Sequence, residues 1–454
     1  MTGAPGAAPW PPVVAAAAEF AFPALPHASA TGMLAVLQLL EQTQWLAPAA
    51  LAHHQREQLA VLLAHARRTT PWYEAALAAL DLDGGLDPDA FAAVPHLTRG
   101  TVKDDADALR SRLLPPDHGA LVRYTTTGST GVPLAIVGTG LTDLWYRALV
   151  LREHLWHERD LGGTLAVIKT RIADRRHAGW GNATAGVFVT GPSVSLDAHH
   201  PLDVQARWLA AEDPDYLLAA ATNLHGLARH CLRHGIRLPR LREVRSYAEM
   251  LRPDTRALCA AAWDVPLVDT YSAEEVGVIA LQCPGHEHYH VMAESLLVEV
   301  LDDAGRPCAP GAIGRVVVTA LHNFAMPLVR YELGDYAEVG PPCPCGRGLP
   351  VLARIVGRRR NLLRRPDGTA HWPTFSAAVW SWLPAIEQIQ LVQDRPDHIR
   401  VRLVTTRVLD ASEQAGLAAR LDERFGAAFN YTFERVNAVE RDNGFEDFVS
   451  LLDD

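Results

Sequence analysis

Lysine is nearly absent from this chain of 454 residues. It occurs only at Lys103 and Lys169, so 40 of the 42 lysine and arginine residues are arginine. Nearly every reaction that needs a lysine side chain is therefore excluded. Acidic residues also outnumber basic ones, by 52 to 42, which gives a net charge of -10. This balance argues against a general nucleic-acid-binding protein, which needs a basic surface.

Cysteine is sparse, and long apolar runs are missing. Six cysteines are too few for a disulfide scaffold in a chain of this length. The chain contains no run of about 18 apolar residues, so no membrane span is predicted. A signal peptide would have a basic region before an apolar core, and the N-terminus shows no such pattern. With 48% hydrophobic and 21% charged residues, the composition is typical of a soluble enzyme. We expect a cytoplasmic protein without a membrane partner.

Hydrophobic patterning divides the chain into three parts. Residues 1–30 are rich in alanine and proline, and we expect a flexible N-terminal arm. In residues 31–356, strand-like runs alternate with helical stretches, which predicts an α/β body of mixed sheets flanked by helices. The charged, turn-rich segment GRRRNLLRRPDG follows, and alternating strands and a helix then predict a small α+β C-terminal domain over residues 357–454. We place the boundary within residues 354–361.

The segment YTTTGSTGVP, residues 124–133, is rich in glycine and hydroxyl groups. Glycines let backbone N–H groups approach an anion, and the hydroxyls add donors, so this segment could wrap a polyphosphate. It is not a Walker A loop, because no Lys-Ser/Thr pair follows the glycines. On composition alone, a surface turn rich in serine and threonine explains the same residues equally well.

Four segments resemble, in the same order, the motifs of adenylate-forming enzymes such as acyl-CoA synthetases. The first is the loop at 124–133, which in that superfamily binds phosphates. Residues 269–277 (DTYSAEEVG) resemble the motif whose tyrosine stacks on adenine and whose glutamate holds Mg²⁺. Residues 331–335 (YELGD) resemble the motif whose aspartate binds the ribose hydroxyls. Residues 354–361 (RIVGRRRN) resemble the hinge before a mobile C-terminal domain.

Within that superfamily, the chain most resembles the phenylacetate-CoA ligase-like branch. The segments HARRTTPWYEAAL, VPHLTRGTVKDD and SYAEML carry this resemblance, which extends from about residue 35 to about residue 450. It implies a large adenylate-forming body and ATP with Mg²⁺, the metal being held by Glu275, since a carboxylate offers the hard oxygen that Mg²⁺ prefers. Glu275 and Thr127 are the implied catalytic residues, and coenzyme A is a candidate acceptor. The implied nucleotide-binding residues are Thr126, Thr127, Gly128, Ser129, Thr130, Gly131, Ala248, Glu249, Asp269, Tyr271, Ser272, Asp335 and Arg358.

Two segments, CPGHEHYH at 283–290 and CPCGR at 343–347, form a cysteine–histidine cluster. Cys283, a histidine, Cys343 and Cys345 would supply a set of four nitrogen and sulfur ligands suited to structural zinc. Members of the resembled branch carry a similar pair of segments, which implies His290 as the histidine ligand, with His288 as the runner-up. The alternative is buried free cysteines beside a solvent-exposed histidine cluster.

One motif of the resembled family is missing. There, a lysine from a Gly-Lys motif in the C-terminal domain stabilises charge in the adenylation transition state. Here the corresponding stretch runs from Gly444 directly into Phe445, and no lysine follows Lys169. Three explanations stay open: an arginine such as Arg435 or Arg441 substitutes, the substrate needs the lysine less, or the chain binds nucleotide without catalysis.

Two smaller departures accompany the missing lysine. Glu274 occupies a position where the family has threonine or serine, and Asn361 replaces the hinge aspartate. Both predict a departure from the family's two-step alternation of the C-terminal domain. The arginines at 358–360 and 364–365 predict a solvated hinge face, since aromatic residues are not interleaved with them as in a nucleic-acid-binding surface.

The sequence therefore predicts an ATP-dependent, AMP- and pyrophosphate-forming ligase. It would activate a small acid as its adenylate and transfer it to a thiol or an amine. One alternative is an enzyme of specialised metabolism that uses ATP to form a nitrogen–nitrogen bond from nitrite, or an amide. A non-catalytic nucleotide-binding homologue is the third hypothesis. Small molecules are the expected partners, and no oligomeric state is predicted.

Overall fold

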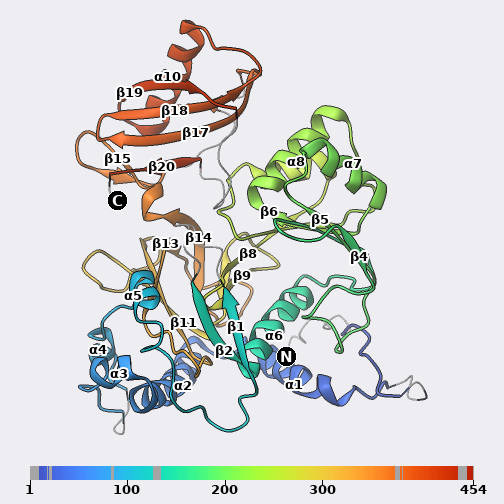
Figure 1. The fold of residues 1–454 in the computed structure, drawn as a ribbon, viewed down its shortest axis with the longest axis vertical. Coiled ribbons are helices and arrows are strands. Elements are labelled where there is room, and N and C mark those ends of the chain that lie inside the picture. The colour runs from blue at the N-terminus through green and yellow to red at the C-terminus, as the bar shows by residue number, and fades with distance from the viewer. Residues whose placement is uncertain are drawn as a thin grey trace.

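The computed structural model describes residues 10–17, 19, 23–82, 86–125, 134–373, 379–380, 382–437 and 447–452. A large body and a small C-terminal domain are stacked end to end (Figure 1). The body contains a mixed sheet flanked by helices, which confirms the predicted α/β class. None of the helices in these ranges is long and apolar enough to cross a membrane.

Helices account for most of the first hundred residues. They are η1 (Ala28–Ala30), α1 (Thr31–Thr43), α2 (Pro48–Thr69), α3 (Pro71–Ala76), α4 (Pro88–Ala92) and α5 (Arg99–Asp104). Proline near the start of α2 favours a helix N-terminus there. Leu59, Leu62 and Leu63 of α2 recur at helical spacing and are fully buried. Of the residues before η1, Val13 bridges to Phe188 of the body.

A twelve-stranded mixed sheet forms the centre of the body, in the order β11-β12-β13-β14-β10-β9-β8-β7-β6-β3-β5-β4. Strands β3, β5, β6, β7 and β8 are parallel, so their carboxyl ends meet at one edge, where ligands bind in open α/β sheets. The strand bounds are β3 Leu165–Lys169, β4 Arg175–His177, β5 Ser193–Asp197, β6 Tyr216–Ala220, β7 Glu243–Tyr247, β8 Leu267–Ala273, β9 Gly277–Gln282, β10 Tyr289–Val291, β11 Leu296–Leu301, β12 Ile313–Ala320, β13 Tyr331–Val339 and β14 Val351–Arg358.

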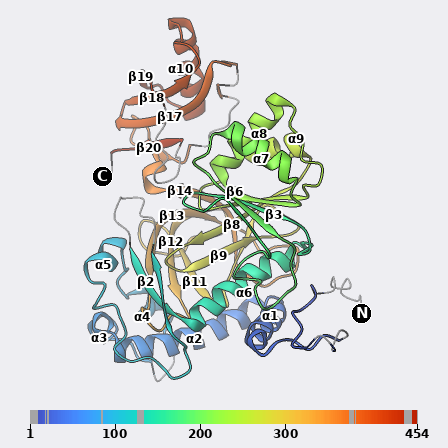
Figure 2. The ribbon, with the colours of Figure 1, turned by 45° about the vertical axis from the view of Figure 1, so that its right-hand side comes forward.

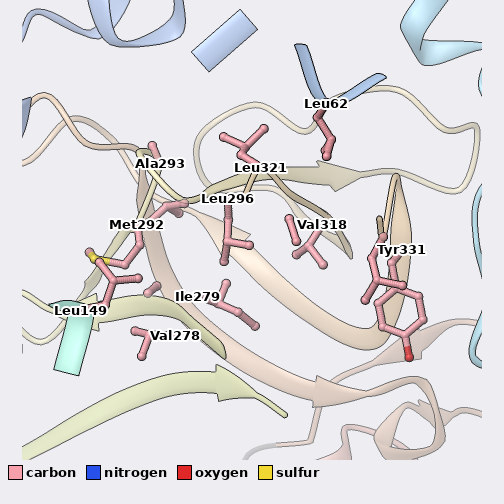
Figure 3. Packing of buried hydrophobic residues seen from close by; sticks show 14 of the residues in the cluster. Leu62, Leu149, Val278, Ile279, Met292, Ala293, Leu296, Val318, Leu321 and Tyr331 are labelled. Carbon is pink, nitrogen blue, oxygen red and sulfur yellow. The ribbon is translucent and has the colours of Figure 1, made fainter. Parts of the chain in front are cut away.

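Helices cover both faces of the parallel strands. Helices α7 (Leu202–Glu212), α8 (Ala221–His234) and α9 (Thr255–Trp263) lie on one face, and α6 (Gly140–Trp156) lies on the other (Figure 2). A hairpin of β1 (Leu121–Thr125) and β2 (Ala135–Thr139) packs near α6. Figure 3 shows Leu62 of α2 and Leu149 of α6 in the same apolar cluster as Ile279 of β9. This core fixes the strand ends that carry the site.

The C-terminal domain follows β14 and the turn η2 (Arg359–Asn361). Its sheet has the order β19-β18-β17-β20, and β20 is the strand nearest the body (Figure 1). Leu417, Leu421 and Phe425 bury one side of α10 in the domain core. The bounds are β15 Leu363–Arg364, β16 Ala370–His371, β17 Ile386–Arg395, β18 His398–Thr405, α10 Ala411–Phe425, β19 Asn430–Arg435 and β20 Phe448–Ser450.

A network of buried charges joins α6 to the parallel strands. Glu153 accepts hydrogen bonds from Arg245 at 2.5 Å and Arg159 at 3.1 Å, and Arg159 also donates to Glu243 at 2.5 Å. Burial alone would raise the pKa of Glu153, but the two guanidinium groups outweigh it and hold that pKa well below its usual value. Two cations and two anions are thus paired between α6 and the parallel strands.

We expect Glu153→Gln to destabilise the body strongly, because it leaves buried guanidinium charge without its partner. Breaking a buried pair in this way costs about 3–5 kcal/mol. The measurement is the urea midpoint of unfolding. Asp203→Asn is the control, since it breaks the exposed Arg207–Asp203 pair and should leave the midpoint unchanged. Equal midpoints for the two variants would contradict a stabilising role for the network.

Candidate functional site

A cavity of about 1360 Å³ opens where the carboxyl ends of the parallel strands face the C-terminal domain. Its lining comes from segments far apart in the sequence. The lining includes eight predicted site residues: Ala248, Glu249, Asp269, Tyr271, Ser272, Glu275, Asp335 and Arg358. The structure therefore gathers every described residue of the predicted nucleotide and magnesium site around one cavity.

Asp335 lies at the centre of a three-residue group. Antiparallel pairing of β13 with β14 sets Asp335 opposite Arg358, and the Arg358 Nε lies 3.5 Å from Asp335 Oδ1. The Tyr271 hydroxyl donates to Asp335 Oδ2 at 2.9 Å. Burial raises the pKa of Asp335, while the charge of Arg358 opposes that rise. The carboxylate is thus held by two side chains at the edge of the cavity, where vicinal hydroxyls of a ligand could replace them.

Glu275 follows β8 and is paired with an arginine that its sequence motif does not contain. Arg99, the first residue of α5, donates to Glu275 Oε1 at 2.7 Å. Only 10% of the Glu275 side chain is exposed. A cation at Glu275 would therefore compete with Arg99 or use the second carboxylate oxygen.

Two other predicted residues, Ala248 and Glu249, shape the turn that follows β7. Ala248 has a positive φ of 65°, which turns the chain after β7 toward the cavity. Glu249 accepts from the backbone and the hydroxyl of Thr222, at 2.9 and 2.6 Å. This bond ties the turn after β7 to the start of α8.

Asp269 lines the cavity, but both of its oxygens are already engaged. The Ser246 hydroxyl donates to Oδ1, and the Tyr289 hydroxyl donates to Oδ2 at 2.6 Å. Burial raises the pKa of Asp269. In this arrangement Asp269 connects β7, β8 and β10.

The predicted phosphate loop lies outside the described residues. This holds for Thr126, Thr127, Gly128, Ser129, Thr130 and Gly131. The strands on either side are described: β1 ends at Thr125, which lines the cavity, and β2 begins at Ala135.

The predicted zinc ligands converge on a second location, away from the cavity. Pairing of β10 with β9 and β14 brings the two cysteine segments together. The sulfur atoms of Cys283 and Cys343 are 3.8 Å apart, and the Cys345 Sγ is 3.4 Å from His290 Nε2. The donor atoms of Cys283, His288, His290 and Cys343 all lie within 4.8 Å of one another. This group of four contains His288, the runner-up, and does not contain the predicted Cys345, whose sulfur contacts His290 from outside it.

These separations fit a tetrahedral metal. Zinc–sulfur bonds of about 2.3 Å and zinc–nitrogen bonds of about 2.0 Å place two sulfurs about 3.8 Å apart, and a sulfur and a nitrogen about 3.5 Å apart. Burial lowers the pKa of His290 to about 4, so its ring is in the neutral form that binds zinc. The chemistry and spacing of the donors therefore suit zinc.

The C-terminal domain contacts the body beside the cavity. Arg252 donates to Asp447 Oδ1 at 3.1 Å, and Asn361 donates to the carbonyl of Phe448 at 2.8 Å. Burial raises the pKa of Asp447 to about 6. Asn361 also accepts from the backbone of Arg358 at 2.7 Å. The residue that replaces the family's hinge aspartate therefore bridges the two domains.

The segment that lacks the lysine is described only in part. Arg441, Gly444 and Phe445 lie outside the described residues, whereas the nearby Asp447 lines the cavity. Arg435 lies on β19, at the opposite edge of the sheet from β20, and donates to the carbonyl of Thr405 at 2.9 Å. In this arrangement Arg435 does not reach the cavity.

Several cavity residues were not predicted from the sequence. They are Arg99, Tyr124, Trp145, Lys169 and His322. Arg99 lies within the segment VPHLTRGTVKDD, and Lys169 is one of only two lysines, so each carried a signal. Trp145 and His322 stack with ring centroids 4.0 Å apart, which is a long-range contact without a local sequence signature.

Comparisons with known proteins agree with this architecture. The family model of the CapK C-terminal domain matches residues 364–447. The phenylacetate-coenzyme A ligase of Thermus thermophilus is 26% identical over 355 residues, covering 73% of this chain and 75% of that protein. Protein CapK of Staphylococcus aureus is 30% identical over 133 residues, covering 28% of this chain and 30% of that protein.

The fold is also found among solved structures. A crystal structure of 2-hydroxyisobutyryl-CoA ligase in the postadenylation state has a TM-score of 0.73 to this chain. It shares 15% sequence identity, and the match covers 90% of this chain and 91% of that one. The crystal structure of the anthranilate CoA ligase AuaEII has a TM-score of 0.52 and 14% identity, over 78% and 73% of the two chains.

Proposed function

Since the chain belongs to the phenylacetate-CoA ligase-like and CapK-like branch of the adenylate-forming superfamily, we propose that it is an ATP-dependent ligase. It uses Mg-ATP to activate a small acid as the acyl adenylate, with release of pyrophosphate. It then transfers the acyl group to a thiol or an amine. Relatives named as coenzyme A ligases favour coenzyme A as the acceptor.

One observation gives this proposal its main support. Tyr271, Glu275, Asp335 and Arg358 belong to three separate motifs of the resembled superfamily, and they line the same cavity. An accidental match of short motifs would not bring them together, because β10 and β9 lie between β8 and the paired strands β13 and β14 in the sheet. Their convergence supports the function more strongly than any motif alone.

The proposed roles follow from the chemistry of each side chain. Asp335 accepts hydrogen bonds from the ribose hydroxyls, and Arg358 offers a guanidinium to ribose or phosphate. Tyr271 and the turn at Ala248 and Glu249 flank the adenine. Ser272 and Asp269 complete the nucleotide side. Glu275 would hold Mg²⁺, while Thr127 and the loop Thr126–Gly131 would bind the phosphates through backbone and hydroxyl donors.

Adenylation in this chain must proceed without a C-terminal lysine. Removing one preorganised donor that stabilises the transition state lowers the catalytic rate by a factor of about 10²–10³. Arg99, which sits 2.7 Å from Glu275, supplies positive charge from the body side of the cavity. We propose that this charge, together with the phosphate loop, carries part of the role that the lysine has in the family.

A pyrophosphate-release assay over acids, amines and nitrite tests the function. Release that depends on a carboxylate supports the proposal. Release that needs nitrite together with an amine would replace it with nitrogen–nitrogen bond formation. Failure to bind ATP in calorimetry would instead indicate a non-catalytic homologue.

We expect Glu275→Gln to abolish Mg-ATP turnover while the protein stays folded. Losing one negative ligand weakens a site for a hard cation. The measurement is pyrophosphate release as a function of Mg²⁺, with circular dichroism to verify folding. Glu338→Gln is the matched control, since Glu338 pairs with Arg354 on the same sheet and lies outside the set of cavity residues. Wild-type turnover by folded Glu275→Gln would remove the adenylate-forming interpretation.

We also propose one structural zinc ion per chain, bound by Cys283, His290, Cys343 and Cys345. Elemental analysis of protein purified without added metal should give one equivalent of zinc. The double variant Cys343→Ser/Cys345→Ser should lose it, whereas Cys308→Ser, a cysteine outside the cluster, should keep it. Comparing His290→Gln with His288→Gln identifies the histidine ligand. Absence of stoichiometric zinc, or full retention in the double variant, would contradict this site.

A further inference from the structure

The part of the cavity beside α6 is built by segments that pack against one another. Thr142 and Leu149 lie on α6 and line the cavity, as does Tyr124 of β1. Gly138 of β2 leaves room for the Tyr124 ring and for Thr142, both of which a Cβ atom at that position would touch. Figure 3 shows Leu149 beside Val278 of β9, which also lines the cavity. We call the part lined by β1, β2, α6, β9 and residues 320–323 the α6 lobe.

The turn after β12 places His322 in the α6 lobe. Asn323 donates to the carbonyl of Val137 in β2 at 3.1 Å, and its side-chain oxygen accepts from the backbone of Ala325 at 3.2 Å. The His322 ring stacks on Trp145 of α6, with ring centroids 4.0 Å apart and an angle of 12° between the planes. Both rings line the cavity. Contacts on β2 and α6 therefore fix the plane of the imidazole before a ligand binds.

His322 has hydrogen-bonding capacity that the protein does not use. Its Nδ1 is buried without a partner, and no hydrogen bond joins either ring nitrogen to a described residue. Burial lowers the pKa of His322 to about 4, so at pH 7 the ring is neutral, with one N–H donor and one acceptor nitrogen. The Tyr124 hydroxyl is also buried without a partner. Buried polar groups normally have a partner, which points to one that a ligand supplies.

The α6 lobe is electrically neutral. Every described residue that lines the cavity from β1, β2, α6, β9 or residues 320–323 is uncharged. The charged residues of the lining, such as Arg358 and Glu275, come from other segments. A second charge on a ligand would be buried in this lobe without a counter-ion, which is costly. The lobe therefore favours an apolar body that carries an uncharged polar group.

The α6 lobe shares two strands with the predicted phosphate loop. β1 ends at Thr125 and β2 begins at Ala135, so these strands lead into that loop and out of it. The proposed ribose and adenine residues come instead from β8, β13, β14 and the turn after β7. An acid whose carboxylate reacts at a phosphate bound by this loop therefore has the α6 lobe beside it.

We propose that the α6 lobe holds the body of the acid and that His322 hydrogen-bonds an uncharged hydroxyl group on that body. The substrate is then a hydroxylated monocarboxylic acid with an otherwise apolar body, in place of a plain hydrocarbon acid or a diacid. A hydroxyl group both donates and accepts, so it matches either nitrogen of a neutral imidazole. This inference rests on the proposed function for the identity of the carboxylate, and it makes His322 a specificity-determining residue.

Calorimetric titration tests the inference without requiring turnover. The probes are phenylacetate, its three monohydroxy ring isomers, 4-carboxyphenylacetate, hexanoate and 6-hydroxyhexanoate, each titrated into the full chain in the presence of AMP. Wild-type protein should bind at least one hydroxy acid about 5-fold or more tightly than its parent acid, as expected for the net gain from one hydrogen bond. It should bind 4-carboxyphenylacetate no more tightly than phenylacetate, because the lobe offers no cation.

Variants assign the preference to one side chain. His322→Phe keeps a ring against Trp145 but removes both nitrogens, so the preference for the hydroxy acid should fall below about 2-fold while the affinity for the parent acid stays within about 2-fold. His322→Gln should keep part of the preference, because an amide also donates and accepts. His53→Phe is the matched control, since the His53 side chain is 62% exposed on α2 and does not line the cavity, and it should behave as wild type.

Four outcomes would overturn the inference. They are absent binding of every probe by wild-type protein, equal affinities for each hydroxy acid and its parent, tighter binding of 4-carboxyphenylacetate than of the hydroxy acids, and an unchanged preference in folded His322→Phe. His322→Leu replaces that variant if circular dichroism shows that it does not fold. A hydroxyl preference without carboxylate-dependent pyrophosphate release would uphold the inference and refute the proposed adenylation, whereas release without the preference would do the reverse.

Discussion

The pairing of β13 with β14 is the constraint on which the site depends most. It sets Asp335 opposite Arg358, and Arg358 is the last residue of β14 before the turn that leads into the C-terminal domain. The same two strands therefore build the side of the cavity where we propose that the nucleotide binds, and the connection to the C-terminal domain. β14 also pairs with β10, which brings Cys343 and Cys345 to His290. A change in this register would disturb the cavity, the connection between the domains and the cysteine cluster together.

The fold was predictable because its signals are local. Strand-like runs such as residues 165–169 and the helical spacing of Leu59, Leu62 and Leu63 report directly on the elements that the structure contains. Motif order also predicted which residues converge, since Tyr271, Glu275 and Asp335 line one cavity. Their roles in catalysis, like those of the loop residues such as Thr127, stay predictions that rest on resemblance and geometry.

The remainder of the site could not be predicted, because its contacts are long-range. The pair of Arg99 with Glu275 joins residues 176 positions apart, and Trp145 stacks on a histidine from another part of the chain. Lys169 was visible in the sequence as a rare residue, but its position beside Tyr247 depends on the order of parallel strands. Side chains that make up a substrate pocket are brought together by topology, which one sequence does not encode locally.

The central claim is that this chain forms an acyl adenylate despite the missing C-terminal lysine. Oxygen transfer reports on that step directly, because formation of the adenylate moves one carboxylate oxygen to AMP when the acyl group is passed on. Incubation with ATP, Mg²⁺, an acceptor and an acid labelled with ¹⁸O in both carboxylate oxygens should yield AMP with one ¹⁸O atom, measured by mass spectrometry. Unlabelled AMP under turnover, or ADP as the nucleotide product, would contradict the account.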